Sequence, residues 1–316
     1  MEANKRLDDA ARAAWLSYIG GKTQDEIAQV LGVSRQSAQR LVSQAMQAGL
    51  VKVRIDHPIA DCLMLAEELK AACGLAYCTI TPALPGSDSA AGVAVALADL
   101  LEQTLSQPDP QIVGLGTGRT LRAAVQAMPH LDCRQHKVVS LTGNISADGS
   151  TAYYNVLFTI SDKVTAPTYP LPMPVLAASP EERETLTGQK TVATTRDLAS
   201  RATLNIVGIG ELDERAPLLL DGFINEADLA RLRAAGAIGE ITGWAFNAEG
   251  KLISGLSNER VTSAPLGLRG ADQGVLTVAA AKGDSKIPGI LGATRGGLIN
   301  GLITDEATAR AVLAAL

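Results

Sequence analysis

The spacing of apolar residues changes along the chain, from one helical pattern near the N-terminus to a regular alternation further on. Over residues 8–48, apolar positions recur every three to four residues, which predicts three consecutive helices. From residue 59 onwards, short runs rich in Val, Ile and Leu alternate with amphipathic stretches. The chain is therefore expected to form a small all-α unit followed by an α/β unit, whose parallel sheet is covered on both faces.

The three N-terminal helices have clear predicted ends. Helix one, residues 8–19, stops at a pair of glycines. Thr23 and Glu26 have the spacing of a capping box, in which each side chain satisfies the other residue's backbone amide, and they mark the start of helix two. Gly32 ends that helix, and Ser34 is the N-cap candidate of a third helix that runs to about residue 48. The apolar face expected on helix one consists of Ala11, Ala14, Trp15, Tyr18 and Ile19.

Two short helices joined through residues 31–34 are the pattern of a helix-turn-helix. Long donor and amide side chains at the start of the third helix are suited to reading base edges in the major groove of DNA. The expected DNA-binding residues are Arg35, Gln36, Ser37, Gln39 and Arg40. Apolar and basic residues alternate over 49–55, which suggests a short strand and leaves a winged form open. An ordinary helical bundle is the alternative. The helix caps, the glycine of the turn and the polar start of the third helix all agree with a helix-turn-helix and disfavour that alternative.

The longer part of the chain alternates strand and helix. Strands are predicted at residues 76–80, 112–115, 137–141, 204–209, 241–246, 274–279 and 299–303. Helices are predicted at residues 59–72, 89–105, 120–128, 153–164, 180–187, 196–202, 225–235, 287–296 and 306–314. The proline-rich run 167–174 is interpreted as an ordered crossing segment. The expected domains are a DNA-binding unit at 1–55, a linker at 56–60, and a larger α/β unit at 61–316.

A Gly/Thr loop, Gly116-Thr117-Gly118-Arg119-Thr120, stands between the second predicted strand and a helix. Backbone amides and the helix dipole make such a place a natural site for an anion or a hydroxyl group. The spacing is neither that of a dinucleotide fingerprint nor that of a P-loop, so a nucleotide is disfavoured. Arg119 and the threonines suit a phosphate or a polyhydroxyl ligand. The alternative is a tight turn that needs glycine only for its backbone.

Two other predicted strands end in similar loops. Thr142, Gly143 and Asn144 follow one of them, and residues 208–211 follow another. Because ligands of doubly wound sheets bind outside the carboxyl ends of the strands, all these loops could face one crevice. Each is equally well explained as a plain turn between strand and helix.

Charge and composition narrow the function. The net charge is −5, but residues 1–55 hold eight Lys and Arg against five Asp and Glu, so this part carries +3 and the rest −8. A basic N-terminal part joined to an acidic remainder is typical of a DNA-binding module linked to a sensor domain. The four cysteines lack metal-site spacing, and neither a metal nor another cofactor is expected. No signal peptide and no membrane span are expected, so the protein is predicted to be cytoplasmic, without a membrane partner.

These motifs resemble those of the SorC family of sugar-responsive transcriptional regulators. The helix-turn-helix residues 23–34 and the loop Gly116–Leu121 resemble family segments. Residues 239–247, GEITGWAFN, resemble a segment usually written Gly-Asp-ϕ-x-Gly-x-ϕ-ϕ-Asp, with ϕ apolar, and residues 297–309 are close to the family ending. The resemblance implies that residues 61–316 form a Rossmann-like α/β effector and oligomerisation domain, with the fold of sugar-phosphate isomerases and glucosamine-6-phosphate deaminase. It also implies a homodimer or homotetramer on palindromic double-stranded operator DNA.

By the same resemblance, the effector site combines the Gly/Thr loop with the segment near Asn247 and with Lys286. The expected effector-binding residues are Gly116, Thr117, Gly118, Arg119, Thr120, Thr142, Gly143, Asn144, Asn247 and Lys286. Two departures bear on the effector: Asn247 replaces the usual aspartate, and Lys282 stands where the family commonly has glycine. The N-terminal third is nearest to regulators of polyol catabolism. The sequence does not distinguish a sugar, a polyol and a sugar phosphate as the effector.

The chain is thus interpreted as a regulator of a carbohydrate or polyol catabolic operon, with no catalytic residues. The alternative is a sugar-phosphate isomerase or deaminase with an added helical module, since fold alone does not fix function. Such an enzyme needs a general base and often a histidine. The three histidines, His57, His130 and His136, are expected in the linker or in loops, none with a carboxylate beside it. A pure scaffold protein would leave the Gly/Thr loop unexplained.

Overall fold

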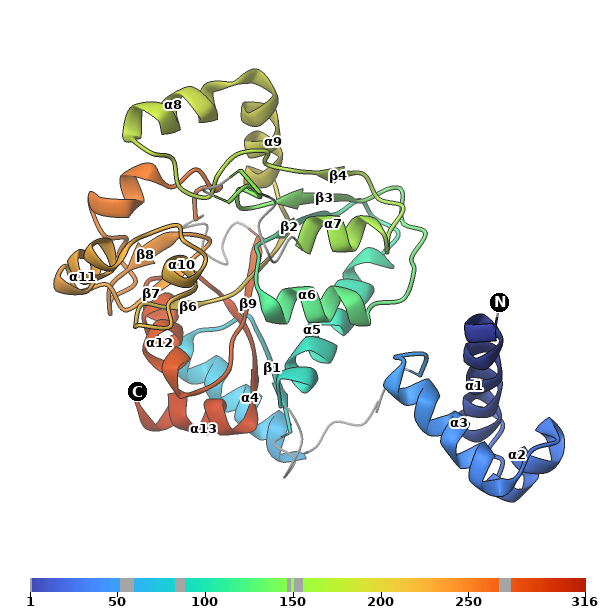
Figure 1. Cartoon of the computed structure of the whole chain (residues 1–316). Coiled ribbons are helices and arrows are strands. Elements are labelled where there is room, and N and C mark those ends of the chain that lie inside the picture. The colour runs from blue at the N-terminus through green and yellow to red at the C-terminus, as the bar shows by residue number, and fades with distance from the viewer. Residues whose placement is uncertain (1, 52–59, 83–88, 147–148, 151–155, 267–273) are drawn as a thin grey trace. The chain divides into compact units, whose positions relative to one another are not determined.

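The computed structural model describes residues 2–51, 60–82, 89–146, 149–150, 156–266 and 274–316. The chain divides into two compact units, Met1–His57 and Pro58–Leu316 (Figure 1). The predicted linker at 56–60 lies outside the described residues, except that Ala60 begins a helix. Among the described residues, no helix is long and apolar enough to cross a membrane.

The N-terminal unit consists of α1 (Glu2–Tyr18), α2 (Gln24–Leu31) and α3 (Arg35–Gln47). The capping box of α2 is formed: the Thr23 amide donates to Glu26 Oε2 at 2.8 Å, and the Glu26 amide donates to Thr23 Oγ1 at 3.4 Å. Gly32 adopts a left-handed φ of 66°, which lets the chain turn sharply between α2 and α3. The helix-turn-helix is therefore confirmed. Residues 49–51 form no strand, and the rest of the predicted wing strand lies outside the described residues.

The face that α1 buries differs from the predicted one. Ala10, Ala13 and Ala14 face the core, whereas Trp15 is 60 % exposed and Ile19 is 71 % exposed. Ala11 and Tyr18 are exposed as well, so only Ala14 of the predicted face is buried. The physical reason is the close packing of α1 on α3, in which small side chains permit a short separation between helices.

The second unit is built on a parallel seven-stranded sheet with the order β1-β10-β9-β5-β2-β3-β4. Its strands are β1 (Tyr77–Thr81), β2 (Ile112–Leu115), β3 (Lys137–Ser140), β4 (Thr168–Tyr169), β5 (Leu204–Val207), β9 (Leu276–Ala280) and β10 (Gly301–Asp305). Because β2, β5 and β9 are neighbours, the loops that follow them meet at the carboxyl edge of the sheet. The Gly/Thr loop is one of these three loops.

Helices cover both faces of this sheet, as predicted. The α-helices described in this unit are α4 (Ala60–Cys73), α5 (Ser89–Leu105), α6 (Arg119–Ala127), α7 (Val156–Ser161), α8 (Pro180–Gly188), α9 (Lys190–Ser200), α10 (Pro217–Leu220), α11 (Glu226–Ala234), α12 (Ile287–Arg295) and α13 (Glu306–Ala314). One aliphatic core lies between the sheet and α5, α6 and α7. A second lies on the side of α4, α9, α12 and α13. The doubly wound α/β architecture is therefore confirmed (Figure 1).

A small antiparallel sheet is the main difference from the predicted elements. It consists of β6 (Gly210–Glu211), β7 (Gly239–Ile241) and β8 (Trp244–Phe246). The single strand predicted at 241–246 is wrong, because the chain reverses at Thr242 and Gly243, where φ is 50° and 93°. The short strands β4 and β6 and the one-turn helix α10 were not predicted. Helix α9 begins six residues before its predicted start at residue 196.

Candidate functional site

The start of α3 presents most of the predicted DNA-binding side chains to solvent. Arg35, Gln36, Gln39 and Arg40 are exposed. Ser37 is only partly exposed, because its amide donates to the N-cap oxygen of Ser34 at 3.1 Å and its hydroxyl accepts from that residue at 2.9 Å. Four long side chains therefore remain available along one side of the helix. This arrangement suits contacts to base edges and phosphates.

Arg35 has a partner on the preceding helix. Its Nε lies 3.6 Å from Asp25 Oδ1, and both side chains are about two-thirds exposed or more. An ion pair this exposed contributes little to stability.

In the α/β unit, the Gly/Thr loop packs tightly against the neighbouring strand. The Gly116 amide donates to the Ile206 carbonyl at 2.8 Å. A Cβ on Gly116 would lie 3.2 Å from that oxygen and 3.3 Å from Thr242 Cγ2, so a side chain here would crowd the end of β5 and the β7–β8 turn. Gly118, with φ 133°, is the N-cap of α6 and brings no side chain to cap the helix. Because glycine has no side chain, Gly118 provides no side-chain acceptor for the backbone amides in the first turn of α6.

Lys286 and Arg119 are brought together, as the family resemblance implies. Lys286 ends a short 3₁₀ helix, η3 (Asp284–Lys286), and only 19 % of its side chain is exposed. Burial lowers the pKa of Lys286 to about 8, and the positive charge of Arg119 adds to this effect. Lys286 forms an ion pair with Glu211 of β6, whose side chain is 13 % exposed. Two cations therefore lie within electrostatic reach of each other at the carboxyl edge.

Two carboxylates that were not among the predicted site residues interact electrostatically with Arg119, one directly and one through the other. These two carboxylates form a charged group with Lys286, Arg119 and Glu211. Glu240 in β7 is buried, with 8 % of its surface exposed, and burial raises its pKa to about 7, although the Gly243 amide donates to its carboxylate at 2.7 Å. Asp221 follows α10 and is exposed, but partial desolvation raises its pKa against the opposing effect of the Arg119 charge. The charge of Asp221 in turn raises the pKa of Glu240. Asp221 thus acts electrostatically on both Arg119 and Glu240.

Thr242 has the features of a binding residue. It is 9 % exposed, and its φ of 50° lies in the left-handed region, which a β-branched residue rarely adopts. Its hydroxyl is buried and has no hydrogen-bond partner in the part of the chain that the structure describes. Both features cost free energy, and strained or unsatisfied groups of this kind concentrate at functional sites.

The loop after β3 is more fully explained by packing. Thr142 is buried, and its Oγ1 accepts from the Ser263 hydroxyl at 3.0 Å. A Cβ on Gly143 would lie 2.4 Å from the Met173 carbonyl oxygen, and the Asn144 amide donates to that oxygen at 3.1 Å. These contacts tie the loop to the crossing segment, and they favour the plain-turn interpretation over direct effector contacts.

Asn247 does not join the group around Lys286. It follows β8, at the end of the hairpin that lies away from the Thr242–Gly243 turn. Its Oδ1 accepts from the amides of Glu249 at 3.1 Å and Lys251 at 2.9 Å, which closes a local turn. The side-chain oxygen is therefore used within its own turn. Within the motif 239–247, Glu240 rather than Asn247 supplies a carboxylate to the charged group.

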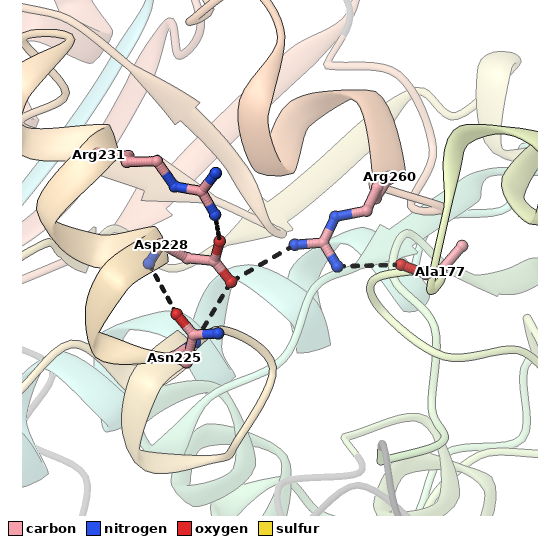
Figure 2. Close-up of polar contacts among 5 residues, drawn as sticks. All are labelled: Ala177, Asn225, Asp228, Arg231 and Arg260. Atoms are coloured by element: carbon pink, nitrogen blue, oxygen red, sulfur yellow. Dashed lines mark hydrogen bonds and ion pairs between the residues drawn. The ribbon is translucent and has the colours of Figure 1, made fainter.

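Polar contacts fix the segment that packs against β8: those of Arg260 are drawn in Figure 2, and Asn258 bonds the strand itself. Asn258, in the 3₁₀ helix η1 (Leu256–Arg260), bonds both the amide and the carbonyl of Ala245 at 2.8 Å. Arg260 at the end of η1 lies 3.7 Å from Asp228 of α11 and donates to the Ala177 carbonyl at 3.3 Å. These bonds fix η1 and, through Asn258, the strand that follows the Thr242 turn.

The histidines and cysteines carry no comparable chemistry. His136 lies in the loop before β3, as predicted, but it is buried, and its Nδ1 accepts from the Gln111 amide at 2.9 Å, which is a structural contact. His130 is exposed, and His57 lies outside the described residues. All four cysteines are free thiols, and burial raises the pKa of Cys78 to about 12. Among the described residues, no cluster of three or more His, Cys, Asp or Glu could hold a metal ion.

The buried Glu240 makes a pH-dependent contribution to stability. Because its pKa is raised from 4.5 to about 7 in the folded protein, the folded state holds the proton more tightly than the unfolded state. This contribution is fully present below pH 4.5 and is lost as the pH rises through 7. Between pH 5 and pH 8, the free energy of unfolding of the wild type is expected to fall by about 2–3 kcal/mol more than that of Glu240→Gln.

Urea unfolding of both proteins at the two pH values measures this difference. Glutamine retains an oxygen that can accept from the Gly243 amide, so the comparison isolates the titrating proton. Identical pH dependence of the two proteins would show that Glu240 has an ordinary pKa.

Each of the two units matches a known protein family. Residues 57–314 match the Sugar-bind family model, which describes a sugar-binding domain, and residues 13–58 match the MarR family model MarR_2. The chain is 36 % identical over 306 residues to the erythritol catabolism regulatory protein EryD of Brucella abortus (strain 2308), covering 96 % of each chain. It is 31 % identical over 309 residues to the transcriptional regulator LsrR of Klebsiella pneumoniae subsp. pneumoniae, covering 96 % of this chain and 92 % of LsrR.

The fold is also that of a solved regulator. The full-length sorbitol operon regulator SorC from Klebsiella pneumoniae superimposes with a TM-score of 0.71 at 24 % identity, covering 97 % of this chain and 99 % of SorC. At this identity the likeness shows the shared fold. These related proteins are transcriptional regulators, and none of the three is an enzyme.

Proposed function

Because this chain belongs to the family of sugar-binding transcriptional regulators that includes EryD, LsrR and SorC, we propose that it controls polyol catabolic genes in response to a phosphorylated polyol. The observation that carries the proposal is the meeting of Lys286 and Arg119 beside the Gly/Thr loop. Two cations and the N-terminus of a helix form an anion site of the kind that binds phosphate. The name of the relative EryD, which refers to erythritol catabolism, supports a polyol as the rest of the ligand.

The two ends of the proposed site have different chemistry. Residues 116–120 and Lys286 bind the phosphate, with backbone amides of the loop and of α6 as additional donors. Glu240 and the unpartnered hydroxyl of Thr242 bind the polyol hydroxyls. A buried carboxyl group and a hydroxyl can each both donate and accept, which suits a ligand whose hydroxyls do the same. Asn247 and the Thr142–Asn144 loop support the site rather than touch the ligand.

The DNA-binding unit is proposed to read its operator with Arg35, Gln36, Gln39 and Arg40 in the major groove. A single short reading helix contacts few base pairs, and helix-turn-helix proteins commonly combine two copies on a two-fold symmetric site. We therefore propose that the protein acts as a homo-oligomer on a palindromic operator. Its place of action would be the cytoplasm, where the DNA lies.

A thermal-shift screen tests the proposed effector class. We expect four- and five-carbon polyol phosphates to raise the melting temperature, because a ligand that binds only the folded state stabilises it by mass action. The matching unphosphorylated polyols should give a smaller shift at equal concentration, since they lack the anion. Stabilisation by the free polyols alone would contradict the phosphate site, and no shift with any sugar or polyol derivative would contradict the proposed effector class.

A further inference from the structure

We propose that Glu211 is a built-in anion that competes with the effector's phosphate for Lys286 and so sets the affinity and charge selectivity of the site. The inference rests on the proposed function, since it takes the Gly/Thr loop and Lys286 to form an anion site. The observation behind it is the ion pair between the Lys286 ammonium and the Glu211 carboxylate, both largely buried. Glu211 was not among the residues predicted to bind the effector.

Two glycines allow the elements that carry Glu211 and Lys286 to pack closely. Glu211 pairs with Gly239 across the small antiparallel sheet, and a Cβ on Gly239 would lie only 3.3 Å from the Cα of Gly289 in α12. A Cβ on Gly289 would in turn lie 2.7 Å from Ile209 Cγ2. The absence of side chains at both glycines lets the start of α12 lie directly against β6 and β7. Lys286 directly precedes α12. The packing of α12 against β6 and β7 therefore fixes the position of Lys286 beside Glu211.

The charges of the group are nearly balanced within the protein. Lys286 is paired with Glu211, and the charge of Arg119 interacts with that of Asp221. An anion that binds Lys286 must share the ammonium with Glu211 or displace it. A phosphate carries up to two charges and several acceptor oxygens, so it competes with a single carboxylate more effectively than a monoanion does. A neutral polyol has no charge with which to compete for Lys286.

The Glu211→Gln variant tests this role, because glutamine keeps the size of the side chain and removes the charge. At pH 6.5, below the pKa of Lys286, we expect inorganic phosphate to bind this variant about tenfold more tightly than the wild type. The matched control is Glu214→Gln, in the loop that follows β6, because Glu214 is exposed. Its affinity for phosphate should equal that of the wild type. Isothermal titration calorimetry of the full chain measures all three affinities.

The direction of the change separates competition from structural damage, which would weaken binding. If Glu211→Gln does not fold, Glu211→Asp provides a second variant, in which the shorter carboxylate reaches Lys286 less well and a smaller gain is expected. Unchanged or weaker phosphate binding in a folded Glu211 variant, with normal binding by the wild type, would overturn the role of Glu211 and leave the anion site intact. Wild-type protein that binds neither inorganic phosphate nor a polyol phosphate would overturn the anion site itself, and this inference with it.

Discussion

An Arg119→Ala variant is expected to lose between about tenfold and a hundredfold in affinity for a polyol phosphate while it binds DNA as the wild type does. Arg119 is the first residue of α6, whose N-terminus itself favours an anion. Its charge acts on both Lys286 and Asp221, which places it within the charged group. Removal of the side chain removes a charge-assisted hydrogen bond from the ligand. Calorimetric titration with the polyol phosphate measures the loss.

Arg134→Ala is the matched control. Arg134 is an exposed arginine of the same unit, paired with Asp132 in the loop that precedes β3, and so lies at the amino edge of the sheet. Its removal should leave ligand affinity unchanged. If Arg119→Ala and Arg134→Ala bind the polyol phosphate equally well, Arg119 plays no part in the site, and the Gly/Thr loop is only a turn.

In the DNA-binding unit, Gln36→Ala is expected to weaken binding to the operator by between about fivefold and a hundredfold and to leave non-specific DNA binding nearly unchanged. Gln36 is exposed in the first turn of α3, where a side-chain amide can bond two groups on one base edge. Its side chain makes no ion pair or hydrogen bond among the described residues of the unit, so its replacement should leave the fold intact. Fluorescence anisotropy with an operator that the wild type selects from random-sequence DNA measures the effect.

Gln47→Ala provides the comparison within the same helix. Gln47 is also exposed, but it is the last residue of α3, away from the end proposed to enter the groove. Its replacement should have no effect on the preference for the operator. Equal losses in the two variants, or none in Gln36→Ala, would mean that another surface of the unit reads the sequence.

Local chemistry explains why much of the fold could be predicted. The ends of α2 depend on Thr23, Glu26 and Gly32, which act within a few residues of sequence. The Gly/Thr loop and its helix are equally local, because a buried strand, glycines and an amphipathic run follow one another directly. The order of strands and helices then leaves little choice but a parallel sheet covered on both faces.

The remaining features depend on contacts between distant parts of the chain. Trp15 looks like a core residue in a helical repeat, yet the packing of α1 on α3 selects the alanine side. Asp221 is an ordinary loop aspartate until the fold brings it near Arg119 and Glu240. Glu240 lies within the motif 239–247, and a carboxylate inside an apolar strand is the sequence signal that points to it. The family pattern points instead to Asn247, but the side-chain oxygen of Asn247 closes its own turn.

We propose that a ligand bound at the carboxyl edge of the α/β sheet controls DNA binding by α3. The most direct test is the affinity of the full-length wild-type protein for its selected operator, measured with and without a saturating polyol phosphate. Coupling between the two sites predicts that the affinity changes by at least about fivefold, and that Arg119→Ala needs about tenfold to a hundredfold more ligand for the same change. An operator affinity that stays the same in the wild type when the ligand site is saturated would contradict the claim.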